Sequence, residues 1–275
     1  MQVVTLYNND FIVKHNKNMD YRKLEDSLFT EWRQRSIDNG DGGELAPDGL
    51  LYRGRFVYRD GFWGREPGDE GLIWERAARR VLILTKDLND DEAWDIRAET
   101  GRKNFSGEQN VVISAPFIKN LMRWVYGLLT IDADGRAKTF AEVDRQDVYQ
   151  PFYDNAPVAR VNCKKQVGTS SIAPAVLRAY MERYKDLLQK QIKMYDADIL
   201  LCCGGSGAIK DFVAENYLTD LVKMNDWVYY SPLTNKLVID SWHPSYTGDT
   251  HEKMYTDMMR NVEDALAKIK GQAEM

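Results

Sequence analysis

Short apolar runs and helix-like patterns alternate along the second two-thirds of the chain. Four apolar runs, each followed by a polar or glycine-rich turn, are typical of parallel strands that are buried on both faces. They span residues 81–84, 158–163, 196–203 and 237–240. Apolar residues that recur every three or four positions predict helices. These cover residues 116–130, 173–194 and 251–270, with a further helix from Ala208.

Strands that alternate with helices predict a right-handed, doubly wound α/β fold, with helices on both faces of a central parallel sheet of about four strands. Residues 1–78 differ, because they are aromatic and glycine-rich and hold one helical pattern, at residues 21–36. The chain length of 275 residues would allow one large domain or two small ones. We expect one α/β domain over residues 79–275, with residues 1–78 as an elaboration packed on its core.

Composition narrows the class of protein. Hydrophobic residues make up 44% of the chain and charged residues 29%, as in ordinary globular proteins. The chain has a net charge of −5, which disfavours a broadly basic, nucleic-acid-binding surface. A local basic groove remains compatible with that charge. Its candidates are Arg79, Arg80, Lys119, Arg123, Lys164 and Lys165.

Cysteine content and hydropathy bear on location and on metals. The three cysteines, Cys163, Cys202 and Cys203, are too few for a disulfide framework, which favours a reducing, cytoplasmic compartment. They also lack the paired spacing of a zinc or iron–sulfur site. No apolar stretch reaches signal-peptide or membrane-spanning length, so neither secretion nor a membrane partner is expected.

In doubly wound sheets, ligands bind beyond the carboxyl ends of the strands. Four loops follow predicted strands, at residues 85–94, 162–170, 204–207 and 241–247. The glycine-rich loop 204–207 could bind an anion, but it lacks the lysine and hydroxyl residue of a P-loop, so a tight turn is favoured.

The other three loops carry side chains with candidate chemistry. Asp87 is a carboxylate at a strand end, where it could face a ligand or cap the next turn. Asn162 could read the edge of a nucleobase, because an amide both donates and accepts, or it could cap a turn. His243, in the segment SWHPSY, could donate a hydrogen bond or a proton near neutral pH, or be merely structural.

Taken together and in order, these segments resemble the uracil-DNA glycosylase superfamily over residues 80–270. Leu84-Thr85-Lys86-Asp87 looks like its first motif, which makes Asp87 the water-positioning carboxylate. Ala115-Pro116-Phe117 resembles the segment whose phenylalanine, here Phe117, stacks on a flipped base. Arg160-Val161-Asn162 is similar to the strand whose asparagine, here Asn162, reads the base. His243-Pro244-Ser245 matches the motif whose histidine, here His243, stabilises the leaving base.

Two motifs depart from the family pattern. Lys86 stands where the first motif has other residues, so the catalytic register could fall on Asn89 instead of Asp87. Tyr246 and the residues after it replace the usual wedge that penetrates DNA. Lys86, Ser245 and Tyr246 are therefore further candidates for the site.

The resemblance implies a DNA-repair glycosylase that hydrolyses the N-glycosidic bond of uracil or a related damaged base. No metal or organic cofactor is implied, and the partner would be DNA that carries the damaged base. Two alternatives share the same fold. One is a non-catalytic nucleic-acid or nucleotide-binding module, and the other is a hydrolase of free nucleosides. The oligomeric state stays open.

Overall fold

The computed structural model describes residues 19–59, 62–90, 92–104, 111–113, 115–169 and 171–273. A seven-stranded sheet lies at its centre, and the four predicted strands are its four parallel members. In spatial order these are β8 (Val158–Asn162), β4 (Val81–Thr85), β10 (Ile199–Cys203) and β13 (Lys236–Ser241).

Short antiparallel strands extend this sheet at both edges. β1 (Gly49–Leu50) pairs with β8 at one edge. β12 (Val228–Ser231) and β11 (Val222–Lys223) follow β13 at the other. Mixed sheets of this kind are common when a parallel core is elaborated.

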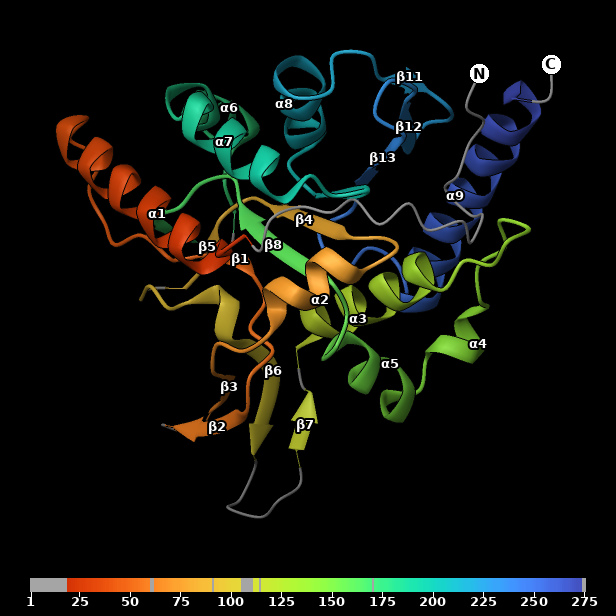
Figure 1. Ribbon diagram of the computed structural model, residues 1–275, viewed down its shortest axis with the longest axis horizontal. Coiled ribbons are helices and arrows are strands. Elements are labelled where there is room, and N and C mark those ends of the chain that lie inside the picture. The colour runs from red at the N-terminus through yellow and green to blue at the C-terminus, as the bar shows by residue number, and fades with distance from the viewer. Residues whose placement is uncertain are drawn as a thin grey trace.

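Helices cover both faces of the sheet, so the predicted three-layer α/β arrangement is confirmed (Figure 1). On one face lie α3 (Pro116–Leu129), α4 (Phe140–Val143), α5 (Gln146–Tyr153) and α9 (His251–Ala273). On the other lie α1 (Tyr21–Asp38), α6 (Pro174–Arg183), α7 (Lys185–Tyr195) and α8 (Ala208–Asn216). Alternate residues of each strand enter the two cores. In β4, Ile83 packs with α3 and Leu84 packs with α1, α6 and α7.

The prediction of one helix over residues 173–194 is wrong. The structure has two helices, α6 and α7, which meet at Tyr184, whose φ of −110° and ψ of 23° are not helical. The ring of Tyr184 is buried and stacks on Trp32 of α1 with ring centroids 5.7 Å apart. No glycine or proline marks this break, so local propensity does not predict it. The packing of Tyr184 on α1 accounts for it instead.

A second sheet in the lower part of Figure 1 was not predicted. It is antiparallel and is formed by β2 (Phe56–Arg59), β3 (Phe62–Arg65), β6 (Glu99–Asn104) and β7 (Val111–Ile113). The helix α2 (Glu70–Arg76) was also missed, since residues 1–78 were expected to hold a single helix. Phe56 and Tyr58 are exposed, so the buried alternation that identifies a strand is absent there.

The N-terminal segment shares the core of the main sheet. Trp32 of α1 and Trp74 of α2 are fully buried against α6 and α7. Gly49 opens β1 with a φ of +149°, and a Cβ at this position would clash with the carboxylate of Glu25. β1 pairs with the edge of β8, the strand that carries Asn162, and Gly49 is in register with Arg160.

Candidate functional site

The carboxyl ends of the four parallel strands form the candidate site. After β4 the chain passes to α3 on one face, whereas after β10 it passes to α8 on the opposite face. Connections that diverge between neighbouring strands leave a crevice at the strand ends, where α/β proteins bind ligands. The four predicted loops follow β4, β8, β10 and β13, and the loop after β13, which carries His243, packs on the one after β10.

A row of polar side chains ends the strands on the α3 face. Thr85 of β4 pairs with Asn162 of β8, and Cys203 of β10 pairs with Ser241 of β13. Leu84 pairs with Cys202, which puts Cys203 beside Thr85. All four members of the row are buried. Residues two apart on a strand share a face, so Arg160 of β8 belongs to the same face as Asn162.

Three side-chain atoms in this region are buried without a hydrogen-bond partner among the described residues. They are Nδ2 of Asn162, Nε of Arg160 and Oγ of Ser241. The other polar atom of the Asn162 amide, Oδ1, accepts a hydrogen bond from the Thr85 hydroxyl. An unpaired buried polar group costs about 1–3 kcal/mol, so such a concentration marks a site prepared for a ligand or for water.

His243 lies over the end of β10 in a loop fixed by hydrogen bonds. The side-chain amide of Asn120 donates to the Pro244 carbonyl at 2.7 Å, and the Tyr246 N–H donates to the His243 carbonyl at 2.8 Å. Gly204, with a φ of +78°, lies beneath the ring, and a Cβ there would be 3.1 Å from the Cβ of His243. Glycine therefore allows the histidine to approach the strand end closely.

The environment of His243 keeps its ring neutral. Burial, and to a lesser extent the positive charges of Lys86 and Arg160, lower its pKa to about 4. The Ser245 N–H donates to Nδ1 at 3.2 Å, which assigns the remaining ring proton to Nε2. His243 can therefore act as a neutral hydrogen-bond donor at physiological pH.

Phe117 lies between His243 and Arg160. Pro116 is the first residue of α3, so Phe117 falls in the first turn of that helix, at the strand ends. Its ring centroid is 5.6 Å from that of His243 and 4.6 Å from the guanidinium carbon of Arg160. Arg160 in turn forms a buried ion pair with Glu99. An aromatic ring, a neutral histidine and a guanidinium are thus in contact.

Asp87 lies between the loops that follow β4 and β8. The Lys164 N–H donates to the Lys86 carbonyl at 2.8 Å, which holds these loops together. The Asp87 carboxylate lies 3.8 Å from the Lys164 ammonium and packs against Gly168, where a Cβ would clash with it. Burial raises the pKa of Asp87, and Lys164 and Lys86 partly oppose this. No hydrogen bond or ion pair joins Asp87 to His243 within the described residues.

The other predicted site residues lie at the rim. Asn89 is exposed in β5 (Leu88–Asn89), which pairs with β9 (Val167–Gly168). Ser245 is exposed and acts through its N–H on His243. The ring of Tyr246 stacks on Trp242 with centroids 6.0 Å apart and planes 4° apart. Lys86 is half-buried and acts on His243 through its charge.

Sequence reasoning misplaced part of the proposed basic groove and missed a buried network. Lys165 and Arg123 are buried, so they cannot contact DNA, and Arg123 pairs with Asp144. The Lys165 ammonium donates to both carboxylate oxygens of Asp48 and to Gln191, at 2.7–2.8 Å. Asp48 also accepts the N–H of Asn162 at 2.8 Å. No sequence signal identified Asp48, because its role depends on a contact 114 residues along the chain.

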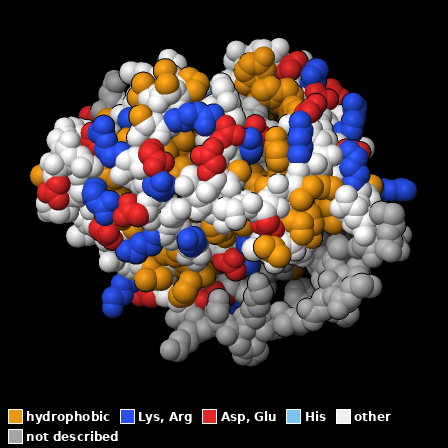
Figure 2. Space-filling view, turned by 90° about the horizontal axis from the view of Figure 1, so that it is seen from above, with side chains coloured by type: hydrophobic (Ala, Val, Ile, Leu, Met, Phe, Trp, Pro, Cys, Tyr) orange, Lys and Arg blue, Asp and Glu red, His pale blue; other side chains and the backbone are white. Residues whose placement is uncertain are grey.

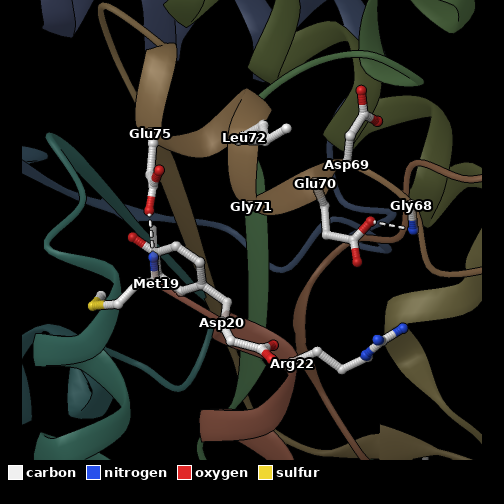
Figure 3. A pocket seen from close by; sticks show the side chains of 10 residues that line it. Met19, Asp20, Arg22, Gly68, Asp69, Glu70, Gly71, Leu72 and Glu75 are labelled. Atoms are coloured by element: carbon white, nitrogen blue, oxygen red, sulfur yellow. Dashed lines mark hydrogen bonds between the residues drawn. The ribbon is translucent and has the colours of Figure 1, made fainter. Parts of the chain in front are cut away.

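A separate depression of about 250 Å³ lies near the start of α1 and α2 (Figure 3). Its wall includes Asp20, Asp69, Glu70 and Glu75. Glu75 already accepts the N–H of Met19 at 2.9 Å, and Glu70 accepts that of Gly68 at 2.8 Å. None of the predicted site residues lines it. These bonds close the ends of the helices and do not indicate a ligand.

Within the described residues, no cluster of three or more histidine, cysteine or acidic side chains could hold a metal ion. No helix in that part of the chain is both long and apolar enough to span a membrane. Figure 2 shows acidic and basic side chains interspersed on the face seen from above.

Comparison with models of known protein families and with curated proteins finds no match to this chain.

Proposed function

We propose that the protein is an N-glycosylase that removes uracil or a related damaged base from DNA. The observation that carries this proposal is the neutral His243, whose ring contacts Phe117, together with the unpaired buried Nδ2 of Asn162 at the carboxyl end of β8. An aromatic face, an amide and a neutral donor are what a planar, hydrogen-bonding leaving group requires. The resemblance of the four motifs supports the same conclusion.

His243 acts on the leaving base. As the bond between the sugar C1′ and the base nitrogen breaks, its electron pair moves into the base, and negative charge develops on the base oxygens. The Nε2 proton of His243 donates a hydrogen bond to one of these oxygens. Lys86 and Arg160 add positive charge near the ring, and Phe117 packs on the face of the base. Preorganised donors of this kind supply a large part of many rate enhancements.

Asp87 acts on the sugar side in this proposal. Water adds its oxygen to C1′ as the base departs, and the released proton moves to the Asp87 carboxylate. Burial raises the pKa of this carboxyl, which makes its ionised form a better base. In the free protein the Asp87 carboxylate lies 3.8 Å from the Lys164 ammonium. The proposed mechanism requires that a water molecule lie between this carboxylate and the sugar when the substrate is bound.

The test is base release from single- and double-stranded oligonucleotides that carry uracil, hypoxanthine or xanthine. His243→Ala is expected to slow release by about 10²–10³-fold, as for the loss of one preorganised donor. Asp87→Asn is expected to slow it by at least tenfold while Tm stays unchanged. Ser206→Ala, in the neighbouring loop, is the control. Release that is unaltered in both site variants would overturn the assigned mechanism.

A hydrolase of free nucleosides is the second candidate, favoured by the interspersed charges of the face in Figure 2 and by the net charge of −5. A protein that grips the DNA backbone normally needs a basic surface. Base release from nucleosides but not from oligonucleotides would select this candidate. Binding of the oligonucleotides without any release would select a non-catalytic binding module.

A further inference from the structure

The identity of the base can be argued from the donors that line the site. Arg160 and Asn162 occupy the same face of β8, and both are buried. Nε of Arg160 and Nδ2 of Asn162 are both without a partner among the described residues. These two side chains, two residues apart on one strand, therefore each have a buried N–H donor that could bind an acceptor atom of a ligand.

The orientation of the Asn162 amide leaves only donors on the β8 side of the site. Its oxygen accepts from the Thr85 hydroxyl, so only the NH₂ group remains to meet a ligand. A guanidinium has no acceptor atom at all. His243 adds a third donor, Nε2–H, because its Nδ1 accepts from Ser245. A ligand that matches these donors must present acceptors at neighbouring positions.

The Arg160 side chain is held in place before a ligand arrives. Glu99 binds its Nη1, and its guanidinium carbon lies 4.6 Å from the centre of the Phe117 ring. The Nε atom of the group has no partner among the described residues, so it is a donor that a ligand could use. Fixed donors discriminate strongly between ligand edges, because a mismatched ligand leaves buried groups unpaired.

We propose that the site selects a 6-oxopurine such as hypoxanthine, and that Arg160 is its specificity-determining residue. The N7 and O6 atoms of a 6-oxopurine are two adjacent acceptors, the pattern that arginine reads in guanine. Uracil fits these donors less well, because its two carbonyl oxygens are separated by N3–H, a donor. This inference rests on the proposed function and names the class of base.

Binding of free bases to the full-length protein tests the inference without a catalytic step. Isothermal titration with hypoxanthine, 7-deazahypoxanthine and uracil compares the acceptor patterns directly. In 7-deazahypoxanthine a C–H group replaces the N7 acceptor, while the ring shape is retained. Hypoxanthine should bind at least tenfold more tightly than each of the other two bases.

Arg160→Lys supplies the matched protein variant. Lysine keeps a positive charge for Glu99 but removes the planar Nε donor. Hypoxanthine binding should weaken about tenfold, while uracil binding should change less than twofold. If this variant does not fold, the comparison with 7-deazahypoxanthine in the unaltered protein still decides. Uracil binding as tight as hypoxanthine binding, or equal binding of the deaza analogue, would overturn the inference.

Oligonucleotide assays separate this inference from the proposed function. Release of uracil in clear preference to hypoxanthine would retain the glycosylase and reject the 6-oxopurine preference. No release from any oligonucleotide, with the expected order of free-base affinities, would reject the glycosylase and retain the 6-oxopurine site. Faster release of hypoxanthine than of uracil, reversed or abolished in Arg160→Lys, would support both.

Discussion

Two groups of buried polar side chains meet at Asn162, and they differ in how completely they are paired. The first is the network of Asp48, Lys165 and Gln191, in which the ammonium makes three hydrogen bonds and the carboxylate accepts from three residues. The second is the row at the strand ends, where Asn162, Arg160 and Ser241 each leave a buried atom unpaired. The main chain of Asn162 belongs to the first group and its side chain to the second.

This difference in pairing distinguishes side chains that stabilise the fold around the site from side chains that could bind a ligand. A saturated buried network has no capacity left for a ligand, so its role is to hold the backbone of Asn162 at the end of β8. An unsaturated row costs stability in the free protein, which is tolerated where a ligand later supplies the partners. The N-terminal segment contributes Asp48 to the first group, so it helps to position the site although it provides none of the predicted site residues.

The largest effect is expected from breaking the saturated network. Lys165→Met leaves Asp48 as an uncompensated buried charge and should lower the free energy of unfolding by about 3–5 kcal/mol. Chemical denaturation measures this loss. Lys164→Met is the matched control, because that ammonium is partly exposed and lies 3.8 Å from its carboxylate. Equal losses in the two variants would contradict the distinction drawn between them.

A smaller loss of stability is expected from a substitution at Gly204, the residue that packs beneath His243. Gly204→Ala forces a non-glycine residue to a φ of +78°, at a cost of about 1–2 kcal/mol. The new methyl group also presses on His243, so base release should fall further than stability alone explains. Gly205→Ala is the control, because its φ is +79° but its Cβ would meet Ile209 and Leu177 instead. Equal activity in both variants would argue against a working role for His243.

The pH dependence of stability tests the neutral state of His243. Its pKa in the folded protein is about 4, below the ordinary value of 6.5, so the unfolded chain binds the proton first as pH falls. Stability is therefore lost as pH falls from about 6.5 towards 4. Because the ring is partly exposed, we expect this loss to be on the order of 1 kcal/mol between pH 7 and pH 5. The loss should shrink in His243→Gln, as measured by denaturation at both pH values.

The smallest effect is expected in the unsaturated row itself. Ser241→Ala removes a buried hydroxyl that has no partner among the described residues, so unfolding should change by less than about 0.5 kcal/mol, or become harder. Thermal denaturation of the protein without ligand provides the measurement. A loss above about 2 kcal/mol would mean that this hydroxyl is already paired, and the contrast with the Asp48 network would fail at that position.

The sequence by itself determined the layers of the fold and the positions of the strand ends. The four parallel strands are continuous apolar runs, and α3 and α9 carry strong apolar periodicity, so local pattern and final burial agree. The same patterns put Asn162 at the end of one buried strand and His243 in the loop that follows another. The positions of these two residues at the carboxyl ends of strands could therefore be predicted from the sequence.

Tertiary structure alone decided how these groups are paired. The break at Tyr184, the second sheet and the Asp48–Lys165 contact join residues distant in sequence, and no local pattern encodes them. Arg160 was visible in the sequence only as a neighbour of Asn162. Its position beside Phe117 and its unpaired Nε follow from packing across the sheet. The physical reason is that periodicity reports which face of an element is buried, whereas a hydrogen-bond partner depends on which elements meet.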